Sequence, residues 1–282
     1  QWNSFSDYQL HHLRNNFLGR FPDFQRRPHA GGTTVSTRTF FDEVPIREFL
    51  TGKEWYPFFK NDPSFGILPL LSGTFLIAGV AMLVAVPIGL SSAIYLSEYA
   101  TERTRKIVKP ILEVLAGVPT VVYGLFALTF VTPLLQTVIP NLPIFNALSP
   151  GIVVAIMIIP QITSLSEEAM GAVPNAMREG ALALGATRLE VALKVILPGS
   201  LSGIISSVVL GISRAVGETM IVSTAAGSTP KFTLDVTESI QTMTSYIVQV
   251  SMGDATYGST IYYSIYAVGM TLFLFTLLMN LL

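Results

Sequence analysis

Long apolar runs dominate the chain from residue 66 onward, and no sustained alternation of apolar and polar positions interrupts them. About 20 apolar helical residues cross the roughly 30 Å hydrocarbon core of a membrane. The pattern therefore predicts an all-α polytopic membrane protein in which Ser149-Pro150 starts the third helix and Pro160-Gln161 interrupt it. The five predicted spans are Gly66–Leu96, Ile107–Leu135, Pro150–Ser166, Gly199–Ala226 and Tyr257–Leu282.

The composition agrees with a membrane protein and excludes some chemistry. Of the 282 residues, 50% are hydrophobic and only 12% are charged, whereas about 25% of a soluble domain is charged. The chain has no cysteine, which excludes disulfides, thiolate metal sites and a cysteine nucleophile. The three histidines show no metal-ligand spacing. We therefore expect the lipid bilayer as its environment, no resident metal and no nucleic acid partner.

Basic residues in the connections predict the orientation. Ser97–Ile107 and Glu167–Pro198 each carry three basic residues, whereas Gln136–Ser149 has none and Ser228–Thr256 has only Lys231. Lysine and arginine accumulate in cytoplasmic loops, so both basic connections belong in the cytoplasm.

Three regions follow from this organisation. Residues 1–39 form an N-terminal segment of unassigned role, residues 40–66 an extracytoplasmic segment, and residues 67–282 the membrane domain. The basic residues within 1–39 would suit the cytoplasm better than the outside, and the chain begins with Gln1. The side of this segment stays open, and one alternative places a membrane helix ahead of the present chain.

Two spans carry small residues at every fourth position, which lets helix backbones approach closely. We expect helix contacts along both stripes. They consist of Ala81, Ala85, Gly89, Ala93 and Ser97 in the first span, and of Gly203, Ser207, Gly211, Ala215 and Thr219 in the fourth.

Arg214 and Glu218 are charged residues inside the apolar fourth span. A charge at mid-bilayer costs at least about 2.5–3.5 kcal/mol, so such residues usually serve a function. In a continuous helix a spacing of four places both on one face, one turn apart. The pair therefore indicates a site that handles an anion, with Glu218 neutralising Arg214 when the site is empty. The alternative is a structural ion pair between helices.

The cytoplasmic loop within 167–198 reads as two short helices with a break. Pro174 suits a first helical turn, and Gly185 supplies a left-handed stop. Thr187 and Glu190 have the spacing of a capping box. A compact helix–glycine–helix element is suited to docking into a groove of another protein.

This loop resembles the coupling loop of importers of the ATP-binding cassette (ABC) type, whose permeases carry the pattern E-A-A-x3-G-x9-I-x-L-P. The matching residues are Glu179, Gly180, Ala181, Gly185, Leu197 and Pro198, preceded by Arg178, with Gly180 in place of an alanine. The strings PSFGILPLL, AVPIGLSSAIYLSEYA, EVLAGVPTVVYG, REGALALGATRLE and SRAVGETM are similar to PstC-type phosphate permeases. Members of that family have six membrane helices, one of them ahead of Phe40.

The resemblance implies an importer permease fold in the bacterial cytoplasmic (inner) membrane and a complex of several subunits. Its partners would be a second, PstA-like permease, two PstB-like ATPase subunits and a PstS-like extracytoplasmic phosphate-binding protein. The chain has no G-x-x-x-x-G-K-[ST] stretch, so we expect no cofactor in this chain, with ATP and Mg²⁺ bound by the ATPases.

The resemblance also assigns transport to the R-x-x-G-E pair, here Arg214 and Glu218, with Thr219 beside them on the substrate pathway. We consider Glu113 and Pro119 as inner-end or gate contacts, against plain capping or kinking. The residues alone leave sulfate, molybdate or a phosphonate open as substrates, and a scaffold that senses phosphate remains a different class of function.

Overall fold

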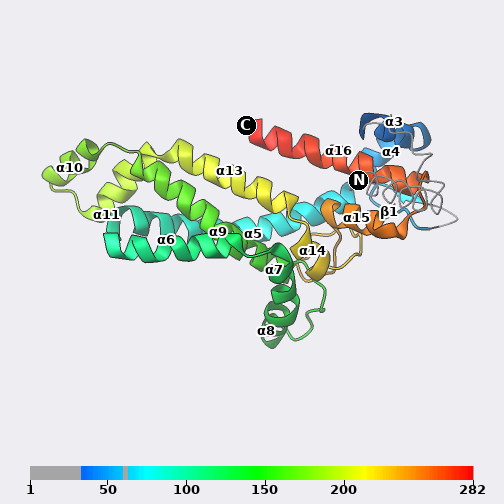
Figure 1. Cartoon of the computed structure of the whole chain (residues 1–282), viewed down its shortest axis with the longest axis horizontal. Helices are drawn as coiled ribbons and strands as arrows, with labels where there is room; N and C mark the ends of the chain where they lie inside the picture. Colours follow the sequence, from blue (N-terminus) through cyan, green and yellow to red (C-terminus); the bar gives the residue numbers. More distant parts are fainter. Residues whose placement is uncertain (1–32, 60–62, 282) are drawn as a thin grey trace, which may run out of the picture.

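The computed structural model describes residues 33–59 and 63–281. Helices α5 (Leu68–Ile94), α9 (Leu148–Gly171), α13 (Leu201–Gly217) and α16 (Thr260–Leu281) run along the long axis of the molecule (Figure 1). Helices α10 (Asn175–Ala183) and α11 (Arg188–Val191) lie at one end, and α3 (Thr33–Glu43), α4 (Ile46–Thr51) and strand β1 (Trp55–Tyr56) at the other. The predicted all-α polytopic architecture is confirmed.

Shorter elements join these helices; η marks a turn of π-helix. They are β2 (Ser64–Phe65), η1 (Tyr95–Tyr99), α6 (Glu102–Gly117), α7 (Thr120–Phe126), η2 (Ala127–Val131), α8 (Thr132–Val138), η3 (Ala192–Ile196), α12 (Leu197–Gly199), α14 (Met220–Ala225), α15 (Met243–Gln249) and η4 (Val250–Asp254).

Four helices in the described part of the chain are long and apolar enough to cross a membrane, and a bent pair raises the number to five. The third span is one helix through Pro160, so the expected interruption there is wrong. It begins at Leu148, where Asn146 Oδ1 accepts the Ser149 amide at 2.8 Å. The spans are Leu68–Tyr99, Thr120–Val138, Leu148–Gly171, Thr260–Leu281 and the pair Arg188–Gly199 with Leu201–Gly217.

The second span begins later than the sequence predicts. Its expected inner part forms the separate amphipathic helix α6, and the apolar helix starts only at Thr120. Val118 and Pro119 are extended between the two helices, with ψ values of 131° and 134°. The ring of a proline disfavours helical geometry in the preceding residue, so Pro119 ends α6 rather than kinking one long helix.

The fourth span is also broken. Helix α13 ends at Gly217, Glu218 is extended with ψ 129°, and α14 starts at Met220. Arg214 lies in the last turn of α13 and Glu218 in the break. The expectation that both occupy one face of a continuous helix is therefore wrong.

The small-residue stripes pack as predicted within α5 and α13, whereas Thr219 lies beyond α13, in the break. A Cβ on Gly89 of α5 would lie 2.8 Å from Ile162 Cγ2 of α9, and one on Gly203 of α13 would lie 2.4 Å from Ala169 Cβ. Gly211 also faces α9, through Ile158 and Ile162. Helix α9 is therefore the central helix on which α5 and α13 pack.

Residues 40–66, the predicted extracytoplasmic segment, pack as an aromatic cluster against α15 and α16. Strands β1 and β2 pair antiparallel, with Trp55 opposite Phe65. Trp55 is fully buried and meets Tyr246 of α15 edge to face, with ring centroids 4.9 Å apart. Of the predicted segment 1–39, residues 1–32 lie outside the described residues, and residues 33–39 open α3.

The loop that was predicted to be cytoplasmic has the two expected helices. Pro174 precedes α10, and Gly185 adopts a φ of +88°, a conformation that glycine takes without steric cost. Thr187 and Glu190 form both hydrogen bonds of the capping box that starts α11. The helix then continues through η3 to Leu197 and Pro198.

Candidate functional site

Arg214 points from the last turn of α13 toward α9. Its side chain is half-buried, and Nη1 donates to Gln161 Oε1 at 3.2 Å. Among the described residues this is the only acceptor within hydrogen-bonding distance, and no carboxylate lies within the 4.0 Å of an ion pair. Since a guanidinium has five N–H donors, most of them remain available to a ligand.

Glu218 is only 8% exposed, and its carboxylate serves α14 rather than Arg214. Oε1 accepts the backbone amides of Met220 at 3.0 Å and Ile221 at 3.3 Å. These amides belong to the first turn of a helix, where no intrahelical acceptor exists. The negative charge of the carboxylate also interacts favourably with the positive end of the helix dipole. The expected neutralisation of Arg214 by Glu218 is absent from this geometry.

Thr219 completes the break. Its hydroxyl donates to the carbonyl oxygen of Gly217 at 3.1 Å, and the hydroxyl of Thr244 in α15 donates to the carbonyl oxygen of Glu218 at 2.8 Å. Side chains thus satisfy the carbonyls that lose their helical partners at this point. Helix α15 is thereby attached to the break beside Arg214.

Helix α7, where the second span starts, adjoins this break. The Tyr123 hydroxyl of α7 donates to the carbonyl oxygen of Leu115 at 2.7 Å, across the junction between α6 and α7. Helix α7 packs on α14 through Gly124, where a Cβ would lie 3.0 Å from Thr224 Oγ1. Broken membrane helices at substrate sites are a recurrent feature of transporters.

Sequence reasoning missed Gln161 as the partner of Arg214. Gln161 was visible as a polar residue in an apolar helix, but its partner depends on how α9 and α13 are rotated. Of the remaining predicted residues, Pro119 is the exposed N-cap of α7. Glu113 is exposed on α6, with no ion-pair or hydrogen-bond partner among the described residues. A role for Glu113 stays a prediction.

The predicted docking loop lies at the opposite end of the long axis from α15 (Figure 1). Its helices expose large apolar side chains, among them Leu184 at 91% and Leu189 at 56%. Glu179, Gly180 and Gly185 are exposed as well, and a Cβ on Gly180 would meet nothing within 4 Å. Exposed apolar side chains on a compact element are typical of a protein-binding surface.

The capping box of this loop is strongly held. The pKa of Glu190 is lowered from 4.5 to about 2, mainly by the hydrogen bond from the backbone amide of Thr187 and next by the hydrogen bond from Lys194. Lys194 Nζ lies 3.1 Å from Glu190 Oε1. The start of α11 is therefore formed at any physiological pH.

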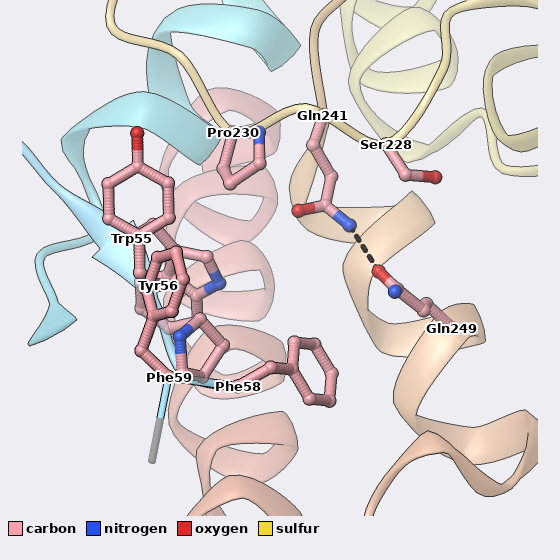
Figure 2. Close-up of a pocket in the computed structure, with 9 residues that line it drawn as sticks. Trp55, Tyr56, Phe58, Phe59, Ser228, Pro230, Gln241 and Gln249 are labelled. Atoms are coloured by element: carbon pink, nitrogen blue, oxygen red, sulfur yellow. Dashed lines mark hydrogen bonds between the residues drawn. The ribbon is translucent and has the colours of Figure 1, made fainter. Parts of the chain in front are cut away.

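Trp55, Gln241 and Gln249 are among the nine residues that line a pocket of about 190 Å³ (Figure 2). Gln241 Nε2 donates to Gln249 Oε1 at 2.6 Å, and Trp55 Nε1 has no acceptor in the described part of the chain. None of the side chains that line this pocket is charged, so it lacks the positive charge that an anion site needs.

Comparison with known proteins identifies the family. The family described as "Binding-protein-dependent transport system inner membrane component" matches residues 85–282. A probable ABC transporter permease protein, YqgH, of Bacillus subtilis is 36% identical over 237 residues, covering 83% of this chain and 76% of its own length. The phosphate transport system permease protein PstC of Mesorhizobium japonicum is 32% identical over 252 residues, covering 82% of this chain and 75% of its own.

Solved structures agree on the fold. A bacterial ABC transporter that imports the acidic polysaccharide alginate aligns over 99% of this chain and 95% of its own, with TM-score 0.61 and 15% identity. The MetNI methionine ABC transporter aligns over 77% of this chain and 90% of its own, with TM-score 0.55 and 17% identity. These likenesses concern the fold alone. The chain belongs to the binding-protein-dependent transport system inner membrane components, the multi-pass permeases of ABC importers, and within that family it is of the PstC type.

Proposed function

We propose that this chain is a permease subunit of an ATP-driven importer of inorganic phosphate and that Arg214 contacts the anion during its passage. The observation that carries the proposal is a half-buried guanidinium with no carboxylate partner among the described residues, placed at the α13–α14 break. A guanidinium stays charged at any relevant pH and can hold two phosphate oxygens at once. The relatives named for phosphate transport support the choice of anion.

The weak contact of Arg214 with Gln161 fits a transport site. An amide oxygen leaves the positive charge intact, so an arriving anion need not displace a carboxylate. Release remains possible because this chain supplies only one cation within the described site, and a pathway must release what it admits. Glu218 and Thr219 hold the shape of the break, which keeps Arg214 in place at the end of α13.

The chain would form half of the pathway, with the other half supplied by a second, PstA-like permease. The loop from Arg178 to Pro198 would dock on PstB-like ATPases, which bind ATP and Mg²⁺, and a PstS-like protein would deliver phosphate from outside. The exposed apolar side chains of the loop support this docking. Another oxyanion as substrate, or a sensing role beside transport, stays an alternative.

Uptake by the complete complex in proteoliposomes tests the proposal. Arg214→Gln should abolish labelled phosphate uptake while subunit composition and basal ATP hydrolysis are retained. Arg103→Gln is the matched control, because Arg103 is exposed on α6 and should leave uptake unchanged. Normal uptake with Arg214→Gln would refute the pathway role, and loss of assembly would favour a structural role. Competition by sulfate, molybdate and phosphonate separates phosphate from the other oxyanions.

A further inference from the structure

Glu98 lies in η1, the π-helical turn that ends the first span on the cytoplasmic side. Its Oε1 atom accepts three hydrogen bonds: from Ser97 Oγ at 2.8 Å, from Arg178 Nε at 3.3 Å and from Arg178 Nη2 at 3.2 Å. The side chains of Glu98 and Arg178 are only 10% and 18% exposed. This ion pair connects residues 80 positions apart in the sequence, and it lies beneath the docking loop rather than on its surface.

Arg178 uses every donor that it has. Beside the two bonds to Glu98, Nη1 donates to the carbonyl oxygen of Val173 at 2.9 Å and to Asn175 Oδ1 at 3.0 Å, while Nη2 donates to the carbonyl oxygen of Met170 at 2.7 Å. These acceptors lie where α9 ends and α10 begins, and helix ends leave such carbonyls without intrahelical partners. A guanidinium with all five N–H groups bonded has one permitted orientation.

Further contacts make this inner end one packed unit. Arg105 of α6 donates to the carbonyl oxygens of Leu96 at 2.7 Å and Ser97 at 2.6 Å. Lys109 of α6 pairs with Glu167 of α9 at 2.9 Å. A small buried cluster lies under the loop; it contains Ala93, Met170, Val173, Val191, Ile196 and Ile204.

We propose that Glu98 is a positioning residue that holds the docking loop to the first span through Arg178, so that loop and span move as one body when the ATPases act. The proposal rests on the docking function of the loop given above. A rigid connection is needed because apolar packing alone permits sliding, whereas a fully bonded guanidinium fixes both position and orientation. We call the Glu98–Arg178 ion pair, with its three backbone and amide contacts, the inner clasp.

The first span also reaches the site at its outer end. Thr74 of α5 accepts the backbone amide of Met243 at 3.2 Å, and the neighbouring Thr244 donates to the carbonyl oxygen of Glu218. These two hydrogen bonds connect α5 to the α13–α14 break beside Arg214. This contact series is a structural connection, and energetic coupling along it is what the experiment has to show.

Glu98→Gln tests the inner clasp in the complete reconstituted complex. The amide keeps the size and one acceptor oxygen but removes the charge. We expect normal subunit composition and basal ATP hydrolysis, with phosphate transported per ATP lowered about fivefold or more, the range of a typical coupling energy. Glu238→Gln is the matched control, because it removes the carboxylate of the exposed outer ion pair Lys231–Glu238. Unchanged transport per ATP in Glu98→Gln would overturn the proposal.

A cross-link between positions 98 and 178 should restore coupling, and it provides a second test if the Glu98→Gln complex does not assemble. The chain has no cysteine, so the double substitution Glu98→Cys and Arg178→Cys introduces a unique pair for a bifunctional thiol reagent. With partner subunits that lack cysteine, the complex should be uncoupled before cross-linking and recoupled after it. A cross-linked complex that stays uncoupled would contradict motion as one body.

A distance measurement separates failure of the inner clasp from failure of the proposed substrate. Spin labels at Ala176→Cys on the loop and Leu83→Cys on α5 are both on exposed positions. We expect their distance to stay the same with and without nucleotide, and to change with nucleotide when Glu98→Gln is present. If phosphate does not stimulate ATP hydrolysis in the wild-type complex, phosphate is rejected as the substrate and the inner clasp is not affected. If the distance between the two labels changes with nucleotide while Glu98 and Arg178 are both present, the inner clasp is rejected and the proposed substrate is not affected.

Discussion

Substituting Glu218 tests whether this carboxylate caps α14 or neutralises Arg214. In Glu218→Ala the amides of Met220 and Ile221, 3.0 and 3.3 Å from Oε1, lose their acceptor in a position that is 8% exposed. Losing an N-cap typically costs about 0.5–2 kcal/mol, and a buried unsatisfied donor costs about 1–3 kcal/mol. We therefore expect Glu218→Ala to lower the free energy of unfolding by about 1–3 kcal/mol.

Glu218→Gln separates capping from charge. Its amide oxygen can still accept both N–H groups, so only the charge-assisted part of the bonds is lost, about 1 kcal/mol or less. Denaturant titration of the purified protein in micelles, followed by helix content, measures both values. Equal destabilisation by Ala and Gln would mean that charge, and not capping, is what Glu218 contributes.

A double-mutant cycle with Arg214→Gln makes the test stricter. Because the structure pairs Arg214 with Gln161 and Glu218 with α14, we expect the two substitutions to be additive within about 0.5 kcal/mol. A coupling energy well above that would show a direct Arg214–Glu218 pair and refute the geometry described here.

Other predictions concern packing and pH. Gly124→Val places atoms against Thr224 and the carbonyl oxygen of Met220 and should destabilise the protein by about 1–3 kcal/mol in the same titration; wild-type stability would contradict the packing of α7 on α14. Gly180→Ala meets open space and should stabilise α10 by about 0.5–1 kcal/mol, whereas a loss would show a hidden contact. The folded-state pKa of Glu190, about 2, lies below its ordinary 4.5, so the capping box should be fully stabilising above about pH 4.5 and be lost as the pH falls toward 2. Spectroscopic titration of a label at the loop tip measures this, and a transition near pH 4.5 would contradict the cap.

Hydropathy and local spacing predicted much of the fold. The membrane helices, the Gly185 stop and the Thr187–Glu190 capping box all depend on residues near one another in the sequence, and so local physics decides them. The small-residue stripes succeeded for the same reason, because periodicity alone shows which face packs.

The two breaks were harder to predict. An apolar window averages over Val118-Pro119 and over Gly217-Glu218, although a proline and a glycine–glutamate step each gave a local signal. The partners of the charged residues could not be predicted, because the Arg214–Gln161 and Arg178–Glu98 contacts depend on how distant helices are rotated and docked. For Arg214 and Glu218 the periodicity argument failed because it assumed a continuous helix.

The role of Arg214 can be tested most directly by removing its positive charge and restoring it. In a complex otherwise free of cysteine, Arg214→Cys should abolish phosphate uptake. Modification with an aminoethyl thiosulfonate, which adds a positive charge, should restore part of it, whereas the sulfonate reagent, which adds a negative charge, should not. Equal uptake after both reagents, or uptake by the unmodified variant, would contradict an anion contact at this position.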